Sequence, residues 1–197
     1  RYNYIPAPQT IHPGVKKLLP GVLVQYRQGG SGEWSETFNQ PWWSFQTVAK
    51  AGSERQFAGS EADAVEELDL LLKQVVQEQS VADVAVGAFL SGGIDSSSIV
   101  AIMQSVSERP VESFTIGYDD VSYDESSDAK RIATHLGTNH HEWIITARDA
   151  MGVIPELPTL YDEPFADASQ IPTTLVSRFA RSHVTVSLSG DGGDELF

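Results

Sequence analysis

Short apolar runs alternate with amphipathic segments from Ser60 onward, and this alternation constrains the fold more than any other feature of the sequence. In residues 60–79, Val and Leu recur at spacings of three and four, which predicts an amphipathic helix. The segments that follow are a strand over 84–90, a helix over 96–106, a strand over 111–118, a helix over 124–136, a strand over 141–145, a helix over 171–181 and a strand over 184–188. Strands alternating with helices of about 10–15 residues predict an α/β fold with a doubly wound parallel sheet.

Residues 1–59 differ in character from the rest of the chain. They hold five of the ten prolines and three of the four tryptophans. Residues 22–26 predict one strand and residues 37–45 a second strand, interrupted at Pro41, with residues 29–33 as the turn between them. We therefore expect a connector with a β-hairpin over 1–59 and an α/β domain over 60–197.

Composition excludes several classes of function. The chain has 197 residues and a formal net charge of −14, which argues against binding to nucleic acid or to an anionic membrane. It contains no cysteine, so disulfides, thiolate zinc sites and cysteine nucleophiles are excluded. There is no apolar run of about 18 residues and no signal-peptide pattern, so we expect a cytoplasmic location.

Both ends of the sequence resemble points of truncation. It opens on Arg1 and closes on Phe197, directly after a turn rich in Gly and Asp. We expect it to be a piece of a longer protein. Such a piece leaves apolar sheet edges exposed, so we also expect it to self-associate, with a homodimer as one form.

A Gly-rich turn follows the predicted strand over 84–90 and opens the next helix. It reads Ser91-Gly92-Gly93-Ile94-Asp95-Ser96-Ser97, with no Lys after the glycines, so it is not a Walker A loop. Such a turn aims backbone N–H groups and the positive end of a helix at one point, which makes an anion site. Asp95 would repel a bare phosphate but suits a bridging Mg²⁺. The turn predicts phosphate binding, with a purely structural turn as the alternative.

A second polar cluster, Ser189-Gly190-Asp191-Gly192-Gly193-Asp194-Glu195, follows the last predicted strand. Because ligands of open α/β sheets bind outside the carboxyl ends of the strands, we expect the two loops to lie on the same edge. Asp95 and Asp194 could then share one Mg²⁺ ion or two. Alone, this cluster would read as a solvated acidic turn.

Three other features have modest interpretations. His140 and His141 are neighbours in a predicted strand and point to opposite faces, so they are not a metal site by themselves. The acidic residues of 119–128 are typical of a loop and a helix start. Tyr161-Asp162-Glu163-Pro164-Phe165 is ambiguous, because its carboxylates could face the site or cap the next turn.

The two loops resemble those of the asparagine-synthetase family of ATP pyrophosphatases, whose phosphate loop is written Ser-Gly-Gly-x-Asp-Ser. Further stretches match in order along the whole chain. They are Tyr4-Ile5-Pro6-Ala7-Pro8, Leu18-Leu19-Pro20-Gly21, Ser113-Phe114-Thr115-Ile116-Gly117, Asp124-Glu125, His135-Leu136-Gly137-Thr138, His140-His141-Glu142 and Tyr161-Asp162-Glu163-Pro164-Phe165. The resemblance implies the adenine-nucleotide alpha-hydrolase-like (PP-loop ATP pyrophosphatase) fold, here as the front part of a synthetase domain with a connector from a glutaminase domain.

The resemblance also implies a reaction. ATP adenylates a small-molecule carboxylate and releases pyrophosphate, and ammonia from the glutaminase domain then forms an amide. The resemblance implies that pyrophosphate is bound by Ser91, Gly92, Gly93, Asp95 and Ser96. It implies that adenosine is bound, largely by main-chain groups, at Phe89, Leu90, Ile116, Ser189 and Gly190. It also implies that Asp95 and Asp194 bind Mg²⁺ and that Asp191 lies near the acceptor substrate. The catalytic residues are therefore expected to be Asp95, Asp191 and Asp194.

The sequence does not identify the acceptor carboxylate. Residues 165–170 lack the basic residue expected in enzymes that make free asparagine. Relatives that amidate sugar acids or close β-lactam rings share the same loop. A nucleotide-binding regulatory module without turnover is a further alternative, although it would not need a pair of metal-binding carboxylates. NAD or GMP synthesis and tRNA thiolation are disfavoured, thiolation because cysteine is absent.

Overall fold

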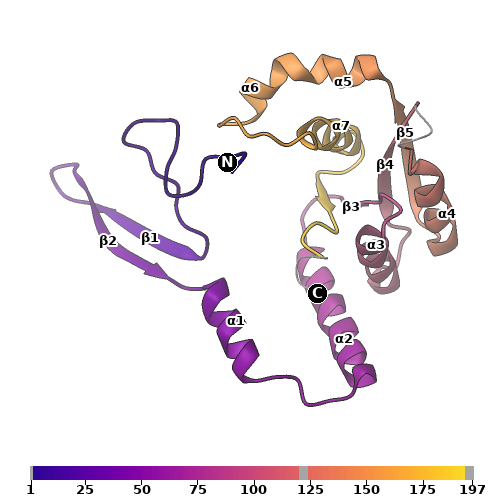
Figure 1. Cartoon of the computed structure of the whole chain (residues 1–197), viewed down its shortest axis with the longest axis horizontal. Helices are drawn as coiled ribbons and strands as arrows, with labels where there is room; N and C mark the ends of the chain where they lie inside the picture. The colour runs from indigo at the N-terminus through magenta and orange to yellow at the C-terminus, as the bar shows by residue number, and fades with distance from the viewer. Residues whose placement is uncertain (1, 120–123, 194–197) are drawn as a thin grey trace. The chain divides into compact units, whose positions relative to one another are not determined.

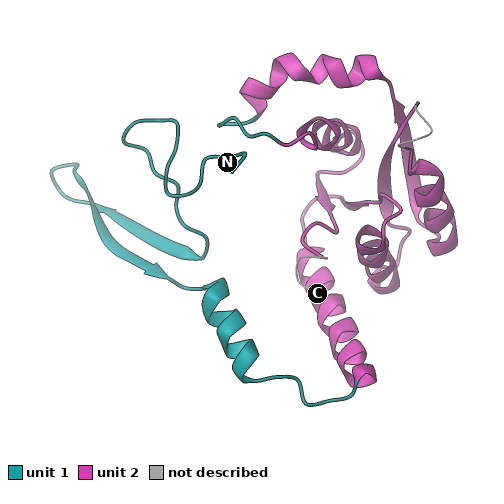
Figure 2. Ribbon diagram, viewed as in Figure 1, with its two compact units in different colours: residues 1–60, 161–166 teal, residues 61–160, 167–197 magenta. Residues whose placement is uncertain are grey.

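A computed structural model describes residues 2–119 and 124–193 of the chain. Contacts between residues divide it into two compact units (Figure 2). Unit 1 consists of residues 1–60 together with 161–166, and unit 2 consists of residues 61–160 and 167–197. The chain therefore leaves unit 2 after residue 160 for a short excursion into unit 1 and then returns.

Unit 1 carries a β-hairpin followed by a helix. Strands β1 (Val22–Gln28) and β2 (Trp34–Pro41) pair antiparallel, with a bulge at Gln25/Tyr26. The predicted continuation of the second strand to Phe45 is wrong, because β2 ends at Pro41 and helix α1 occupies Phe45–Glu54. Proline cannot donate to a strand ladder, and the Ser44 hydroxyl accepts the N–H of Thr47 at 3.4 Å, which caps the new helix.

Unit 2 has the predicted alternation of strands and helices (Figure 1). Its described elements are α2 (Glu61–Gln79), β3 (Val86–Phe89), α3 (Ile94–Val106), β4 (Glu112–Tyr118), α4 (Ser126–Leu136), β5 (Asn139–Ile145), α5 (Ala147–Val153), a 3₁₀ turn (Ile154–Glu156), α6 (Leu157–Leu160), α7 (Gln170–Arg181) and β6 (Val186–Leu188). The sequence interpretation missed α5 and α6. A capping box between Thr146 and Asp149 starts α5, and that Thr-x-x-Asp pattern was a readable signal.

The described strands of unit 2 form a parallel sheet in the order β5-β4-β3-β6, which confirms the predicted doubly wound α/β fold. The chain runs outward from β3 through β4 to β5 and then crosses back to place β6 on the other side of β3. Successive connections therefore diverge between β3 and β6. Ligands of open α/β sheets bind at such a switch point, at the carboxyl ends of the strands.

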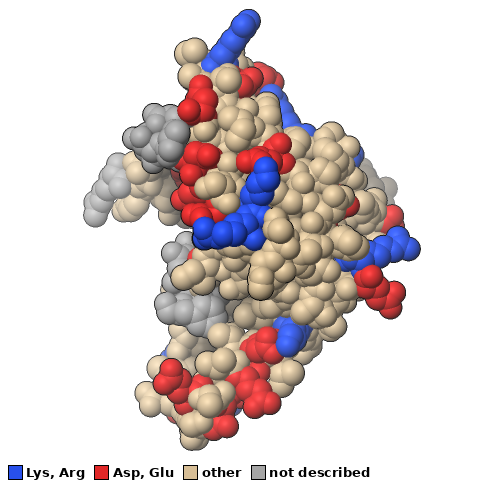
Figure 3. Space-filling view, turned by 90° about the vertical axis from the view of Figure 1, so that its right-hand side faces the viewer, with Lys and Arg blue, Asp and Glu red and all other residues tan. Residues whose placement is uncertain are grey.

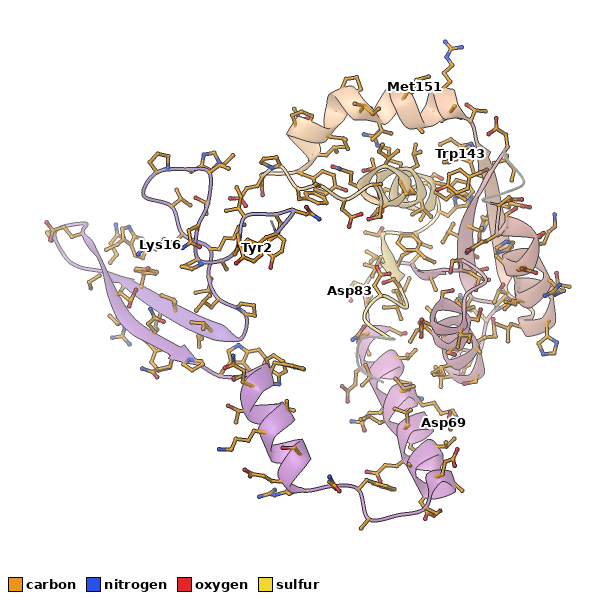
Figure 4. All side chains as sticks on the ribbon, viewed as in Figure 1. Tyr2, Lys16, Asp69, Asp83, Trp143 and Met151 are labelled. Carbon is orange, nitrogen blue, oxygen red and sulfur yellow. The ribbon has the colours of Figure 1, made fainter. Side chains whose placement is uncertain are left out.

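Apolar side chains cover both faces of this sheet. One cluster joins α2, α3 and α4 to the sheet around Val100 and Ala129, which have no exposed surface. On the opposite face, α7 packs over Phe114, which is also fully buried, with the Phe179 ring edge-on at 5.9 Å. Trp143, labelled in Figure 4, extends from β5 toward α7 and meets Phe179 at 5.9 Å. Both strand faces are buried, as a parallel sheet requires.

The two neighbouring histidines lie on opposite faces of β5, an edge strand of the described sheet. His140 Nδ1 is 2.9 Å from the Ser113 hydroxyl, whereas His141 Nε2 is 2.6 Å from a carboxylate oxygen of Glu112. Asn139 donates to both oxygens of the same carboxylate, at 2.8 and 2.9 Å. These side chains therefore join β4 to β5 at the amino ends of the strands, opposite the switch point.

Charged side chains are mixed on the surface that Figure 3 turns toward the viewer. On α4, Lys130 pairs with Glu142 at 3.2 Å and Arg131 with Asp128 at 3.0 Å. This surface therefore carries paired charges rather than a basic patch. Within the described ranges, no helix combines the length and the apolar character that crossing a bilayer requires.

Gly87 lets β3 and β4 approach closely, and its replacement tests this packing. A Cβ atom at Gly87 would lie 2.7 Å from the Glu112 carbonyl oxygen and 2.7 Å from the Phe114 ring. We expect Gly87→Ala to lower the free energy of unfolding by about 1–3 kcal/mol, measured by urea denaturation. The control is Gly152→Ala in α5, where no atom lies within 4 Å, and it should not destabilise. Equal stability of the two variants would contradict the packing.

Glu112 makes stability depend on pH at the acid side. Burial alone would raise the pKa of its carboxyl, but hydrogen bonds from Asn139 and His141 outweigh burial and hold the pKa below the ordinary 4.5. The ionised group therefore stabilises the folded state above pH 4.5, and this contribution is lost as the pH falls through the lowered folded value. We expect Glu112→Gln to flatten this acid-side loss in urea unfolding series. Superimposable pH profiles for the two proteins would show that the carboxylate does not contribute.

Candidate functional site

A cavity of about 800 Å³ opens at the carboxyl ends of β3, β4 and β6, beside the switch point. Its size falls within the range of about 300–1,000 Å³ that small-molecule sites occupy. All of its lining residues within the described part of the chain belong to unit 2. Its lining residues are Phe89, Leu90, Ser91, Gly93, Asp95, Ser96, Phe114, Thr115, Ile116, Tyr118, Glu125, Asp167, Ser169, Pro172, Thr173, Val176, Ser189, Gly190, Asp191 and Gly192.

The loop between β3 and α3 is held by its own serine hydroxyls. Ser96 Oγ accepts the N–H of Ser91 at 3.2 Å and lies 2.9 Å from Ser91 Oγ, and Ser97 Oγ donates to the carbonyl of Gly93 at 2.6 Å. Gly92 has φ +88°, in the left-handed region that glycine adopts at low cost. This arrangement turns the chain from strand to helix within a few residues.

Helix α3 points its amino end at the cavity. The first N–H groups of an α-helix have no intrahelical acceptor, and no side chain caps α3 at Gly93. Asp95 lies in the first turn, and both Asp95 and Ser96 line the cavity. The start of α3 therefore combines positive helix-end charge with hydroxyl donors and one carboxylate.

The loop after β6 lies directly against the start of α3. A Cβ atom at Gly190 would be 2.6 Å from the backbone nitrogen of Ser96 and 2.7 Å from the carbonyl carbon of Asp95. A Cβ atom at Gly193 would be 2.8 Å from an oxygen of the Asp95 carboxylate. Only glycine allows both approaches without movement, so the two loops form one wall of the cavity.

Asp124 braces another part of the wall, where β4 leads into α4. One oxygen of its carboxylate accepts the N–H of Ser126 at 3.1 Å and the N–H of Tyr118 at 3.3 Å. Hydrogen bonds from Ser126 are the main reason that the pKa of the Asp124 carboxyl lies below its ordinary value. This brace sets where Tyr118 and Glu125 meet the cavity.

Every charged side chain that lines the cavity among the described residues is a carboxylate. They are Asp95, Glu125, Asp167 and Asp191. The backbone N–H of Ser169 donates to Asp167 at 2.8 Å and lowers the pKa of that carboxyl, so Asp167 is ionised at neutral pH. A phosphate in this cavity must therefore be balanced by backbone N–H groups, a cation or basic groups from outside the described lining.

The polar groups of the cavity partly fit a nucleotide bound together with a divalent cation. Tight glycine contacts, hydroxyl donors and a helix start suit phosphate oxygens, and the Asp95 oxygens suit Mg²⁺. Between residues 2–119 and 124–193, no three His, Asp or Glu side chains gather closely enough to hold a metal ion without further ligands. Phosphate oxygens and water commonly complete a magnesium site.

The structure brings most of the predicted site residues together. Those that line the cavity are Phe89, Leu90, Ser91, Gly93, Asp95, Ser96, Ile116, Ser189, Gly190 and Asp191. Gly92 belongs to the same loop but faces away, since a Cβ atom there would lie 3.1 Å from the backbone nitrogen of Ala129 at the start of α4. Asp194 lies outside the described residues.

Sequence interpretation missed the cavity wall formed by α7 and the residues just before it. This wall contains Asp167, Ser169, Pro172, Thr173 and Val176. The helical pattern over 171–181 reveals an apolar face, but it does not reveal which side chains of that face reach a cavity. Thr115, in the middle of β4, and Glu125, the residue before α4, also line the cavity and were also missed.

The fold and the cavity define an α/β protein with a ligand site at the switch point of a parallel sheet. Comparison with known families is more specific. The family profile described as asparagine synthase matches residues 67–197. The chain belongs to the asparagine synthase family.

Curated relatives agree with this family. A putative glutamine-hydrolysing asparagine synthetase of Mycobacterium tuberculosis is 32% identical over 195 residues, which cover 99% of this chain and 28% of that protein. Asparagine synthetase [glutamine-hydrolyzing] 1 of Bacillus subtilis is 33% identical over 196 residues, covering 100% of this chain and 29% of the relative. The chain thus spans less than a third of the length of these relatives.

Among solved structures, an NH3-dependent NAD synthetase from Campylobacter jejuni matches with a TM-score of 0.48 at 16% identity. The match covers 66% of this chain and 58% of that chain.

Gly190 tests the contact between the two loops. Because a Cβ atom there would press on backbone atoms of Asp95 and Ser96, we expect Gly190→Ala to separate the loops and open the cavity wall. The free energy of unfolding, measured by urea denaturation, should fall by about 1–3 kcal/mol. Gly152→Ala serves as the matched control and should unfold like the parent, because no atom lies within 4 Å of a Cβ atom there. Unchanged stability of the Gly190→Ala protein would refute this role for the contact.

Proposed function

We propose that the protein containing this chain uses ATP to activate a carboxylate as an acyl-adenylate, with release of pyrophosphate, and that ammonia then displaces AMP to give an amide. The observation that carries the proposal is the joining of the two Gly-rich loops at the switch point, in a chain of the asparagine synthase family. In this reaction the bond between the α-phosphorus and the bridging oxygen breaks, and the carboxylate oxygen takes its place on phosphorus.

The first loop is proposed to hold the pyrophosphate. Backbone N–H groups at the start of α3 and the hydroxyls of Ser91 and Ser96 would donate to its oxygens as negative charge develops on the leaving group. Gly92 allows the turn through its left-handed φ of +88°, and Gly93 leaves the cavity free of a side chain at its position. Mg²⁺, held by Asp95 and Asp194, would supply positive charge beside the phosphates.

Adenosine is proposed to occupy the apolar part of the cavity. Phe89, Leu90 and Ile116 lie at the carboxyl ends of β3 and β4, and Ser189 and Gly190 lie just after β6. Backbone groups at strand ends can recognise the adenine edge and the ribose hydroxyls without any charged side chain. A lining whose charged side chains are all carboxylates is compatible with this mode of recognition, since adenosine itself carries no charge.

The acceptor carboxylate is proposed to lie near Asp191, and ammonia would come from glutamine hydrolysed by another domain of the same protein. Aspartate is the acceptor that the relatives' names suggest. Asp167 lines the cavity, in the stretch where a basic side chain would suit a dicarboxylate. This observation favours testing sugar acids and β-lactam precursors beside aspartate.

The decisive experiment is ATP–pyrophosphate exchange by the full-length protein with Mg²⁺, across these candidate carboxylates. We expect carboxylate-dependent exchange that EDTA abolishes. Asp95→Ala should lower it by about a hundredfold or more, because the leaving pyrophosphate loses its charge compensation. The control is Asp69→Ala, since Asp69 lies on α2 outside the cavity and pairs with Lys73 at 2.6 Å.

Two outcomes would contradict the proposal. Exchange that survives Asp95→Ala unchanged would remove the first loop from the chemistry. Tight ATP binding with no exchange under any carboxylate would favour a nucleotide-binding regulatory module.

A further inference from the structure

Thr115 is a buried polar residue of β4 to which the proposed function gives no part. It lines the cavity, yet only 3% of its surface is exposed. Its hydroxyl donates to the backbone carbonyl of Leu90, the residue that joins β3 to the Gly-rich loop. A buried hydroxyl requires such a partner, so this contact fixes the Thr115 side chain.

The peptide group between Leu90 and Ser91 is held on both of its sides. Its carbonyl accepts the Thr115 hydroxyl, and its N–H donates to Ser96 Oγ at 3.2 Å. The N–H of Leu90 itself donates to the Phe114 carbonyl at 2.9 Å, which continues the pairing of β3 with β4. Because a peptide group is planar, its carbonyl and its N–H turn together, so holding the carbonyl also aims the N–H at Ser96.

A continuous hydrogen-bond chain thus runs from β4, through the last peptide group before the Gly-rich loop, to the first turn of α3. Since Ser96 Oγ accepts a hydrogen bond in this chain, its own hydrogen must point elsewhere. Two acceptors near it are Ser91 Oγ at 2.9 Å and the Gly93 carbonyl at 3.3 Å. Ser96 also lines the cavity, so the same hydrogen can be donated to a ligand oxygen there. Each hydrogen bond in such a chain polarises the next, which strengthens the final donor.

We propose that Thr115 is a positioning residue of the nucleotide site, which orients the Leu90–Ser91 peptide group and thereby aims the Ser96 hydroxyl at the phosphate oxygens of ATP. This inference rests on the proposed function, because it requires ATP to bind in the cavity. Thr115 itself offers almost no surface to a ligand. The hydrogen-bond chain consists of protein groups alone, so it orders the loop without drawing on the binding free energy of ATP.

Ser113 supplies the matched control. It is a fully buried hydroxyl residue on the same face of β4, two positions before Thr115. Its hydroxyl is 2.9 Å from Thr138 Oγ1 and 2.9 Å from His140 Nδ1, on the side of β5 rather than of β3, and it does not line the cavity. Loss of either hydroxyl should lower the stability of the sheet, but only loss of the Thr115 hydroxyl should alter the site.

Calorimetric titration of the full-length protein with Mg²⁺–ATP tests the role of Thr115. Thr115→Val keeps the shape of the side chain but removes the donor, and we expect it to raise Kd about three- to tenfold. Thr115→Ser keeps the hydroxyl and should bind within about twofold of the parent. Ser113→Ala should lower the midpoint of urea unfolding, as Thr115→Val does, yet bind ATP like the parent.

Two further measurements report on the hydrogen-bond chain itself. Hydrogen exchange of the peptide that covers residues 90–97, read by mass spectrometry without ATP, should be faster in Thr115→Val than in the parent and unchanged in Ser113→Ala. In a double-mutant cycle, Ser96→Ala should cost less ATP affinity in the Thr115→Val protein than in the parent, because Thr115 acts through the Ser96 hydroxyl.

The outcomes separate the positioning role from the proposed function. If the parent binds Mg²⁺–ATP and Thr115→Val binds equally well, the positioning role is refuted and the proposed function stands. Equal losses of affinity in Thr115→Val and Ser113→Ala, or additive losses with Ser96→Ala, would show a general loosening of the sheet and also refute it. Failure of the parent to bind Mg²⁺–ATP would overturn the proposed function and this role together.

Discussion

The candidate site depends on the contact between the loops that follow β3 and β6. Gly190 and Gly193 bring the backbone of one loop to within side-chain distance of Asp95 and Ser96 in the other, with no room for a Cβ atom. These loops leave adjacent parallel strands in the same direction, so their meeting is a consequence of the sheet order. The cavity, its donors and the placement of Asp95 all follow from this contact.

The acidity of the site has a consistent physical basis. All charged side chains of the described cavity lining are carboxylates, so the site cannot attract a polyphosphate through Lys or Arg of its own lining. A helix start, turn N–H groups and serine hydroxyls provide donors that carry no full charge. Under the proposed function, the carboxylates would bind the cation that accompanies ATP, and nucleotide binding would then be coupled to the metal ion.

Much of unit 2 could be predicted from its sequence, and unit 1 much less. The spacing of apolar residues in 60–79 and the apolar runs before Ser91 and Ser189 made strands, helices and both loops predictable, although Val76 is the one buried residue of α2. By contrast, Phe45 was assigned to a strand, because the cap formed by Ser44 is a local signal that competes with an apolar, aromatic-rich pattern. The ion pair of Glu163 with Lys17 was not predictable, since the two residues are distant in sequence.

By itself, the sequence determined the alternation of elements, the two loops and the resemblance that carries the proposed chemistry, because these depend on local pattern and residue type. Only the tertiary structure decided which loops meet, which way Gly92 faces, and that Asp167 and Val176, before and within α7, supply a wall of the cavity. It also decided that residues 161–166 pack with the amino-terminal segment. The physical reason is the same in each case: strand order and long-range contacts join residues that no local periodicity connects.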